Sequence, residues 1–472
     1  MKTDTKILFV YDYTSPTSHI PNALNFRYLD SYIRNEFDYP DSIISEITSK
    51  YSDGISVMNQ NPTIPIDGTV NVGEISKFEL DTIYLYNVCP FGGASCTYGY
   101  PYTLNDGFSF FHFISKKSLN FIKNIDNYYL LIDYSNEGTL DYNWFNIIYN
   151  DAIKFEIPLN KIIFSISDFD IVDNFNKWFN SQNIHVDRIH LLYANWSFPA
   201  KSKEYKKIIN NEKTSFGKYS NNCSVVEKSD ISKDKFRNYK FLMFNRRLRP
   251  HRIYSILYFY HMNIIDDILI SYDFNNMMCF DICDNDKRRD HFSDKSELES
   301  IYKTYSDLIK THPKKTIDYD DLENVWGFNF ENKQPYLDSY IHITSETNFF
   351  ETGGYFSEKT WKPIGNLQPF IMMGSYRSLE ELKNLGFKTF HPFIDESYDL
   401  IENNEDRFIF IINEINRISK LPISEIHEWY HSIYDDILVH NQNLLMDYDY
   451  SLHKKINKKL KNDIFKINNN RS

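Results

Sequence analysis

The sequence predicts an α/β protein with two domains, and three observations support this prediction. Apolar, strand-like runs alternate with helical patterns through most of the 472 residues, which is typical of an α/β architecture. The chain is too long for one ordinary hydrophobic core, so two domains are the default expectation. A polar segment over residues 201–235, rich in Lys, Ser and Asn, interrupts the alternation and indicates the connection between the domains.

The first half of the chain contains strand-like runs separated by helix-like stretches. We expect strands at Ile7–Tyr11, Thr82–Tyr86, Tyr128–Asp133, Lys161–Ser165 and Arg188–Tyr193. We expect helices at Ser115–Ile125, Asn143–Asn150 and Val172–Asn180. These elements would form a first domain over residues 1–215, and a linker over residues 216–237 would follow it.

The second half would form another α/β domain over residues 238–420, with a helical extension over residues 421–472. Strands are expected at Lys240–Phe244, Tyr340–Thr344, Pro369–Met373 and Phe387–Phe390. Helices are expected at Ile253–Met262, from Ser357, from Ser378, over 424–445 and over 454–466. Pro250 fits the first turn of its helix, where a missing N–H costs nothing. Ser378 and Glu381 form a capping box, and the helix that they start would end at Gly386.

Charge and composition exclude some classes of function. The net charge of −12 argues against a general nucleic-acid binder, which would need a basic surface. Five unevenly spaced cysteines do not make a disulfide framework, so we expect free thiols. The first residues lead directly into a strand, and no long apolar segment follows. We therefore expect no signal peptide or membrane span, and an intracellular, cytoplasmic protein.

Against this acidic background, four arginines lie within seven positions, from Arg246 to Arg252, in Asn245-Arg-Arg-Leu-Arg-Pro-His-Arg252. A strand is expected to end at Phe244, a short loop carries the basic residues, and a helix follows. This arrangement offers backbone N–H groups and cationic side chains to a phosphate. A surface network of salt bridges with nearby acids is the alternative interpretation.

A second candidate site lies about a hundred residues later, where a helix is expected to begin at Ser357. Glu358-Lys359 alone is a weak signal, but a glycine pair precedes it and a short apolar strand follows it. Lys359 would meet a phosphate as a point charge, and Glu358 would accept hydrogen bonds from ribose hydroxyls. Glu346 lies at the end of the preceding strand, where ligands gather in open α/β sheets.

These two motifs resemble a known family. The segment Ile343-Thr-Ser-Glu346, with the later Phe356-Ser-Glu-Lys359, resembles the donor-site signature of α-1,3-fucosyltransferases, in which a glutamate at a strand end precedes a Thr-Glu-Lys helix start. The loop from Asn245 to Arg252 is similar to the family's loop, where an arginine binds the pyrophosphate of GDP-fucose. The fuller pattern also resembles fucosyltransferase-related proteins of large DNA viruses and phages. The resemblance covers about residues 240–400, and Ser357 replaces the usual Thr.

The resemblance implies a glycosyltransferase with a GT-B fold, in which two Rossmann-like domains face each other across a cleft. Transfer would be inverting and would need no essential metal or other cofactor. The partners would be a nucleoside-diphosphate sugar, GDP-fucose first, and a glycan or glycoprotein acceptor. Arg252 would bind the pyrophosphate, Glu358 the ribose, and Lys359 a second phosphate. The expected donor-binding residues are Asn245, Arg249, Arg252, Glu346, Glu358 and Lys359.

The catalytic base would come from the first domain. Candidates at expected strand ends are Asp12, Asp133 and Glu137. We favour Glu137 because the adjacent Gly138 lets its loop approach a ligand closely. An ordinary turn or cap role is the alternative for any single acid in such a place.

Two further interpretations stay open. Asp168-Phe169-Asp170 follows an apolar strand, and this spacing suits a divalent metal that bridges a nucleotide diphosphate, as in metal-dependent GT-A glycosyltransferases. The same spacing recurs at Asp318–Asp320 and Asp447–Asp449, so chance can produce it in a chain rich in Asp. The other alternative is a sugar-binding or structural protein that keeps the fold without turnover.

Overall fold

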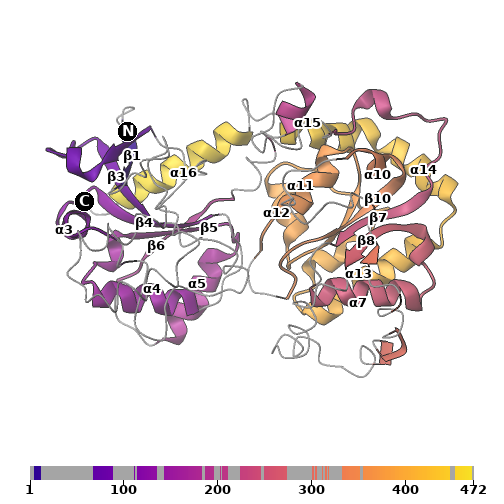
Figure 1. Cartoon of the computed structure of the whole chain (residues 1–472), viewed down its shortest axis with the longest axis horizontal. Helices are drawn as coiled ribbons and strands as arrows, with labels where there is room; N and C mark the ends of the chain where they lie inside the picture. The colour runs from indigo at the N-terminus through magenta and orange to yellow at the C-terminus, as the bar shows by residue number, and fades with distance from the viewer. Residues whose placement is uncertain are drawn as a thin grey trace. The chain divides into compact units, whose positions relative to one another are not determined.

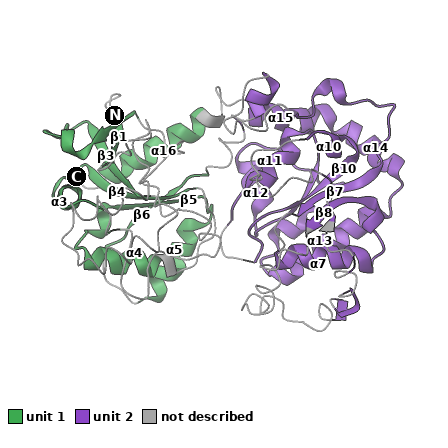
Figure 2. Ribbon diagram, in the orientation of Figure 1, with its two compact units in different colours: residues 1–196, 454–472 green, residues 197–453 purple. Residues whose placement is uncertain are grey.

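The computed structural model describes most of the chain in separate stretches (Figure 1). The described residues are 5–11, 67–88, 111, 114–135, 143–182, 187–195, 202, 205–210, 224–245, 249–273, 300–301, 303–305, 311, 314–315, 317, 332–350, 354–446 and 452–469. The chain divides into two compact units, residues 1–196 with 454–472, and residues 197–453 (Figure 2). Each unit is an α/β structure around its own sheet, as the alternation of apolar runs and helical patterns predicts.

Unit 1 contains a parallel six-stranded sheet with the strand order β2-β1-β3-β4-β5-β6. The strands are β1 (Lys6–Tyr11), β2 (Gly68–Asn71), β3 (Thr82–Val88), β4 (Tyr128–Tyr134), β5 (Ile162–Ile166) and β6 (His190–Tyr193). The helices are α3 (Lys116–Asn124), α4 (Asn143–Lys154), α5 (Ile171–Ser181) and α16 (Leu452–Asn469), with short 3-10 turns η1 (Val72–Glu74) and η4 (Leu159–Lys161). All five strands expected in this half are present, and the polar edge strand β2 is additional.

The two faces of this sheet build two separate apolar cores, because successive side chains of a strand point to opposite faces. One core combines even-numbered strand residues such as Leu130 with apolar residues of α3, α4 and α5. The other combines odd-numbered residues such as Leu131 with Leu460 and Ile464 of α16. Figure 1 shows this C-terminal helix in yellow along the sheet of unit 1. The helix expected over residues 454–466 is therefore present, and it packs in unit 1, whereas residues 421–446 belong to unit 2.

Unit 2 contains a five-stranded sheet with the order β11-β10-β7-β8-β9, parallel except for the short antiparallel β9. The strands are β7 (Tyr239–Asn245), β8 (Ile268–Asp273), β9 (Lys314–Lys315), β10 (Ser339–Ser345) and β11 (Phe370–Met373). The helices are α7 (Pro250–His261), α10 (Gln334–Leu337), α11 (Glu358–Gly365), α12 (Ser378–Asn384), α13 (Asn404–Ser419), α14 (Ile423–Ser432) and α15 (His440–Met446). Shorter turns are η6 (Lys228–Asp230), η7 (Ile265–Asp267), η10 (Glu396–Leu400) and the π-helical η11 (Tyr434–Val439).

The strand expected at Phe387–Phe390 is wrong, since this segment is an irregular loop. Its backbone donors bond to side chains and not to a neighbouring strand. The Lys388 N–H donates to Asn441 Oδ1 at 2.8 Å, and the Phe390 N–H donates to a carboxylate oxygen of Glu396. Side chains from later helices thus replace the strand partner that the apolar pattern suggested.

The capping box expected at Ser378 is also wrong, although a helix does begin there. The cap residue is Arg377, in the left-handed conformation with φ 63°, and its side chain makes no capping bond. The carboxylate of Asp399 accepts the first N–H groups of the helix instead, at 2.8 and 2.9 Å. The helix stops as expected near Gly386, whose φ of 98° suits a residue without a side chain.

The described helices include none with the length and apolar character that a membrane span requires. This statement covers only the described ranges of the chain.

Candidate functional site

In unit 2, two neighbouring parallel strands, β7 and β10, end at the same edge of the sheet. Their register pairs Phe241 with Ile341 and Leu242 with His342. Continued to the strand ends, this register brings Asn245 of β7 beside Ser345 of β10. A helix follows each of these strands, α7 after β7 and α11 after β10. Ligands of open α/β sheets bind at this carboxyl edge, so the side chains there are candidates for ligand contacts.

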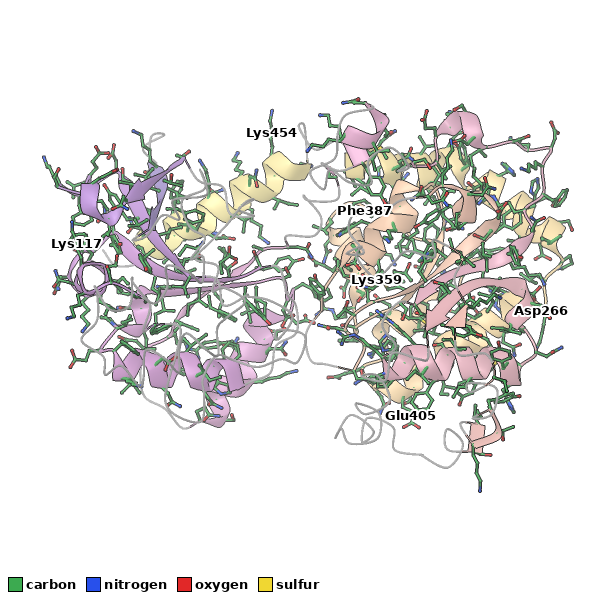
Figure 3. The ribbon with its side chains drawn as sticks, in the orientation of Figure 1. Lys117, Asp266, Lys359, Phe387, Glu405 and Lys454 are labelled. Carbon is green, nitrogen blue, oxygen red and sulfur yellow. The ribbon has the colours of Figure 1, made fainter. Side chains whose placement is uncertain are left out.

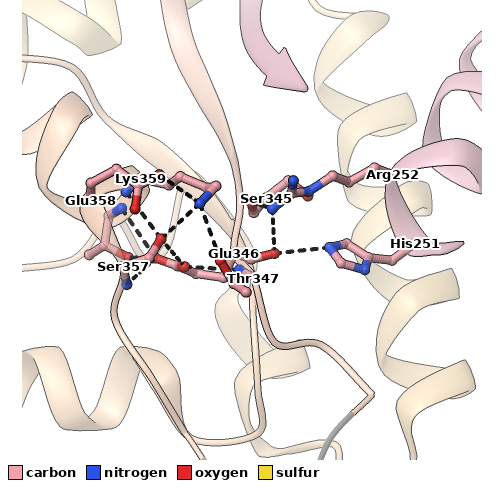
Figure 4. Close-up of polar contacts among 9 residues, drawn as sticks. His251, Arg252, Ser345, Glu346, Thr347, Ser357, Glu358 and Lys359 are labelled. Carbon is pink, nitrogen blue, oxygen red and sulfur yellow. Dashed lines mark hydrogen bonds and ion pairs between the residues drawn. The ribbon is translucent and has the colours of Figure 1, made fainter. Parts of the chain in front are cut away.

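The start of α7 is tied directly to the end of β10 (Figure 4). The buried guanidinium of Arg252 donates to Ser345 Oγ at 3.1 Å, to the Ser345 carbonyl at 2.8 Å and to the Glu346 carbonyl at 2.9 Å. His251 Nε2 lies 3.0 Å from the same Glu346 carbonyl. Pro250 occupies the first turn of α7, as expected, and Arg249 is the cap residue. Arg252 therefore fixes the start of α7 against the end of β10, in addition to contributing its positive charge.

The start of α11 is held by the fully buried carboxylate of Glu346. One oxygen accepts the N–H of Ser357 at 3.1 Å and that of Thr360 at 3.2 Å, together with the Thr360 hydroxyl. The other oxygen accepts the Thr347 N–H at 3.1 Å and the Ser357 hydroxyl at 2.5 Å. A helix N-terminus attracts anions, and here the anion is a side chain of the protein itself. Glu346 thus positions α11 by these bonds.

Lys359, labelled in Figure 3, forms an ion pair with Glu358 in the first turn of α11 (Figure 4). The Lys359 ammonium lies 2.8 Å from Glu358 Oε1 and also donates to the hydroxyls of Ser357 and Thr347, each at 3.2 Å. The side chains of Lys359 and Glu358 are 22% and 15% exposed. Burial alone would raise the pKa of Glu358, but the adjacent Lys359 and the nearby Lys362 lower it to about 2. Glu358 is therefore ionised at neutral pH.

The cationic residues of both motifs act on one another at this edge. Burial is the main cause that lowers the pKa of His251 well below its usual value, and the charges of Arg252, Arg249 and Lys359 lower it further. Burial also lowers the pKa of Lys359, where Glu358 opposes the shift and Arg252 adds to it. The two motifs, separated by about a hundred residues, therefore bring Arg249, Arg252 and Lys359 within electrostatic reach of one another, beside the carboxylates of Glu346 and Glu358.

Asn245 stands out at this edge because its buried side-chain amide makes no hydrogen bond to the described residues. It is completely buried at the end of β7, and its amide nitrogen and oxygen have no hydrogen-bond partner among the described residues. Native proteins rarely leave a buried amide without partners, because this costs free energy. Such an amide is available to a bound ligand.

The structure thus brings the expected donor-binding residues to one sheet edge. They are Asn245, Arg249, Arg252, Glu346, Glu358 and Lys359. The side chains of Arg252 and Glu346 are buried and form hydrogen bonds within the protein, whereas those of Arg249, Glu358 and Lys359 are partly exposed. Arg246 and Arg247 lie outside the described residues.

Among the candidates for the base, the structure describes only Asp133, since Asp12 and Glu137 lie outside the described residues. Asp133 is buried at the end of β4 in unit 1, and its Oδ1 accepts the Ser135 N–H at 3.1 Å. Burial raises the pKa of Asp133, and hydrogen bonds from Ser135 partly oppose this shift.

The Asp168-x-Asp170 motif has a local structural role. Asp168 is fully buried, its Oδ1 accepts the Asp170 N–H at 2.8 Å, and its Oδ2 accepts the Asn174 side-chain amide at 2.9 Å. These bonds stabilise the turn into α5, which favours a capping role over metal binding. In the described parts of the chain, no three His, Cys, Asp or Glu side chains are grouped as metal ligands.

Sequence reasoning missed Arg407 of α13, a buried arginine that holds the loop after Glu346. Its guanidinium donates to the carbonyls of Phe349 at 2.8 Å, Ile401 at 2.7 Å and Gly374 at 3.2 Å. Its position in the sequence could have revealed that Arg407 is buried, because it lies four residues before Ile411 on the apolar stripe of the helix.

No protein-family model matches the chain, and comparisons with curated proteins and with solved structures found no significant match. The resemblance to fucosyltransferases therefore rests on the two sequence motifs alone.

Proposed function

We propose that unit 2 binds the diphosphate of a nucleoside-diphosphate sugar, and that the protein is an inverting glycosyltransferase of the GT-B type. The observation that carries this proposal is that Arg249, Arg252 and Lys359 lie together at the carboxyl edge of a parallel sheet. By the motif resemblance, GDP-fucose is the first expected donor.

The electrostatics of the site favour a dianionic group beside these cations. Arg252 lowers the pKa of Lys359, which means that the two positive charges repel each other. A phosphate beside both would relieve this repulsion and would form charge-assisted hydrogen bonds. The N-terminus of α7 adds the positive end of a helix dipole to the same region.

The neighbouring side chains suit the remainder of a nucleotide sugar. Glu358 is ionised and partly exposed, so it would accept hydrogen bonds from ribose hydroxyls. The buried Asn245 amide would bond to a polar group of the ligand that reaches the end of β7.

The reaction would be a single displacement. A carboxylate would remove the proton of the acceptor hydroxyl, and the cationic edge would stabilise the departing diphosphate, in the role that a metal has in other transferases. Unit 1 would supply that carboxylate, Glu137 or Asp133. Burial raises the pKa of Asp133, which makes its carboxylate a stronger base than that of an exposed aspartate.

The first test replaces Lys359 with alanine and measures binding of GDP by calorimetry. Loss of one charge-assisted contact should cost about 1.5–3 kcal/mol, which is about tenfold or more in the dissociation constant. The fold should persist, because Lys359 is partly exposed and bonds only to neighbouring side chains. Lys420→Ala, an exposed residue after α13, is the control and should leave the affinity unchanged. Equal affinities of Lys359→Ala and the wild-type protein would remove Lys359 from the site.

The second test replaces Asn245 with leucine, which has nearly the same shape. Removing a buried amide without partners should raise the free energy of unfolding by about 1–3 kcal/mol and should weaken GDP binding. Asn366→Leu is the matched control, since the Asn366 amide accepts from Val226 N–H at 3.0 Å and donates to the Lys362 carbonyl at 2.9 Å. That control should be destabilised. A destabilised Asn245→Leu with normal GDP affinity would show that the Asn245 amide is structural.

A further inference from the structure

A group of polar residues is buried at the carboxyl edge of the sheet in unit 1, far in sequence from the site described above. Asn87, Asp133 and Ser165 are 2%, 5% and 0% exposed, and they belong to the neighbouring strands β3, β4 and β5. The register pairs Asp133 with Ser165, and it pairs Asn87 with Leu131. Residues opposite each other in parallel strands share a face, and so do residues two apart in one strand, so all three polar side chains share one face.

This is the face that α16 covers. Its apolar core includes Leu85, Leu131 and Ile163 together with residues of α16. The next residue on the same face of each of these strands is Asn87, Asp133 or Ser165. Polar side chains therefore replace the apolar core near the ends of three adjacent strands, with Asp133 and Ser165 in register and Asn87 one step earlier, beside Leu131. One polar residue would be an ordinary exception, whereas three neighbouring ones on the same face form a built feature.

The hydrogen-bonding capacity of this group is largely unused. Both polar atoms of the Asn87 amide and the Ser165 hydroxyl are buried without a partner among the described residues. Asp133 accepts the Ser135 N–H, and burial favours the protonated form of its carboxyl group. Orphaned buried polar atoms are costly, and a position in the middle of an apolar face could hold Leu or Val at no such cost.

We propose that Asn87, Asp133 and Ser165 form a binding site for an uncharged group with neighbouring hydroxyls, such as a sugar ring. An amide and a hydroxyl each donate and accept, and a carboxyl group accepts, which matches hydroxyls of a sugar that do both. Adjacent strands lie about 4.8 Å apart, so one pair of ring hydroxyls can reach two of these residues. An anionic ligand fits poorly, because it would face a carboxyl group. Under the proposed function this site would hold the acceptor sugar, and only that role rests on the proposed function.

The test uses the full chain without nucleotide and four neutral sugars, glucose, galactose, mannose and N-acetylglucosamine. Saturation-transfer NMR should detect binding of at least one sugar to the wild-type protein. Asn87→Leu and Ser165→Ala should each weaken that binding at least tenfold while the melting temperature stays equal or rises, because each removes an orphaned polar group. GDP affinity should stay unchanged in both variants, which separates this site from the donor site.

Ser167→Ala is the matched control. The Ser167 hydroxyl donates to the carbonyls of Ala194, at 2.9 Å, and Ser135, so its loss should lower the melting temperature and leave sugar binding intact. The proposal fails if no sugar binds to the wild-type protein, or if Asn87→Leu and Ser165→Ala bind sugar as the wild-type protein does. If the sugar tests fail while GDP still binds, the proposed donor site is unaffected. If GDP does not bind while a sugar does, the proposed sugar site is unaffected.

Discussion

Glu346→Ala is expected to lower the free energy of unfolding by about 3–5 kcal/mol, the range for removing one partner of a buried charged interaction. The Glu346 carboxylate accepts hydrogen bonds from the backbone of Ser357, Thr360 and Thr347 and from two of their hydroxyls. Hydrogen bonds to a charged group contribute about 1.5–3 kcal/mol each, and the donors left behind would be buried. Chemical denaturation followed by tryptophan fluorescence measures this loss.

The same change should weaken GDP binding, because Glu346 fixes the turn that carries Lys359. Glu346→Gln keeps the shape but turns an amide NH₂ toward groups that are themselves donors, so it should recover only part of the stability. Glu428→Ala, at an exposed position of α14, is the control and should change the free energy of unfolding by less than about 0.5 kcal/mol. An unfolding curve of Glu346→Ala equal to that of the control would contradict the role assigned to the carboxylate.

The central parallel strands of both sheets could be predicted from the sequence. Strands β4 and β10 are buried at every position. Such strands have nearly continuous apolar sequences, which local pattern reading detects. β8 has the same nearly continuous apolar sequence over Ile268–Tyr272. The pattern was therefore sufficient to predict this strand, although we did not expect it. The polar β2, Gly68–Asn71, carries no such signal and owes its place to pairing with β1.

Contacts between distant parts of the chain could not be predicted in this way. The cap of α12 comes from Asp399, some twenty residues later, and a local rule assigned it to Ser378. The loop at Phe387–Phe390 is fixed by Glu396 and Asn441, and no local pattern announces these partners. Local chemistry therefore predicted where elements begin and end better than it predicted which side chains hold them there.

The candidate site shows the same division. The two motifs predicted which residues meet at the sheet edge, since helix starts and strand ends can be read locally. Their roles depend on geometry that only the fold supplies. Arg252 and Glu346 were both expected as ligands of the donor, yet their polar atoms bond to the strand end and the helix start. Each therefore positions the neighbouring residues, and Lys359 becomes the better test of direct phosphate contact.

Arg407→Ala is expected to cost about 4–5 kcal/mol, near the upper end for single substitutions. Burial lowers the pKa of Arg407 to about 10, so the side chain is still charged at neutral pH. Its guanidinium donates to the Phe349, Gly374, Ile401 and Glu402 carbonyls and to the Asn404 side chain. Alanine would leave the buried carbonyls of Phe349 and Gly374 without this donor and would leave a cavity as well. Lysine offers no planar fork of donors, so Arg407→Lys should recover only part of the loss.

The effect should also reach the candidate site, because Arg407 supports the start of α7 through stacked rings. Its guanidinium lies 4.8 Å from the ring centre of Phe349, and that ring stacks on His251 at 5.3 Å. GDP affinity measured where Arg407→Ala is still folded should therefore fall. Arg417→Ala is a matched control on the same helix. Its side chain is 47% exposed and pairs with Glu414, whose buried carboxylate also accepts the Asp395 N–H, so its loss should cost less than the loss of Arg407 and leave GDP affinity unchanged. Equal losses of stability in the two variants would show that Arg407 does not hold this loop in place.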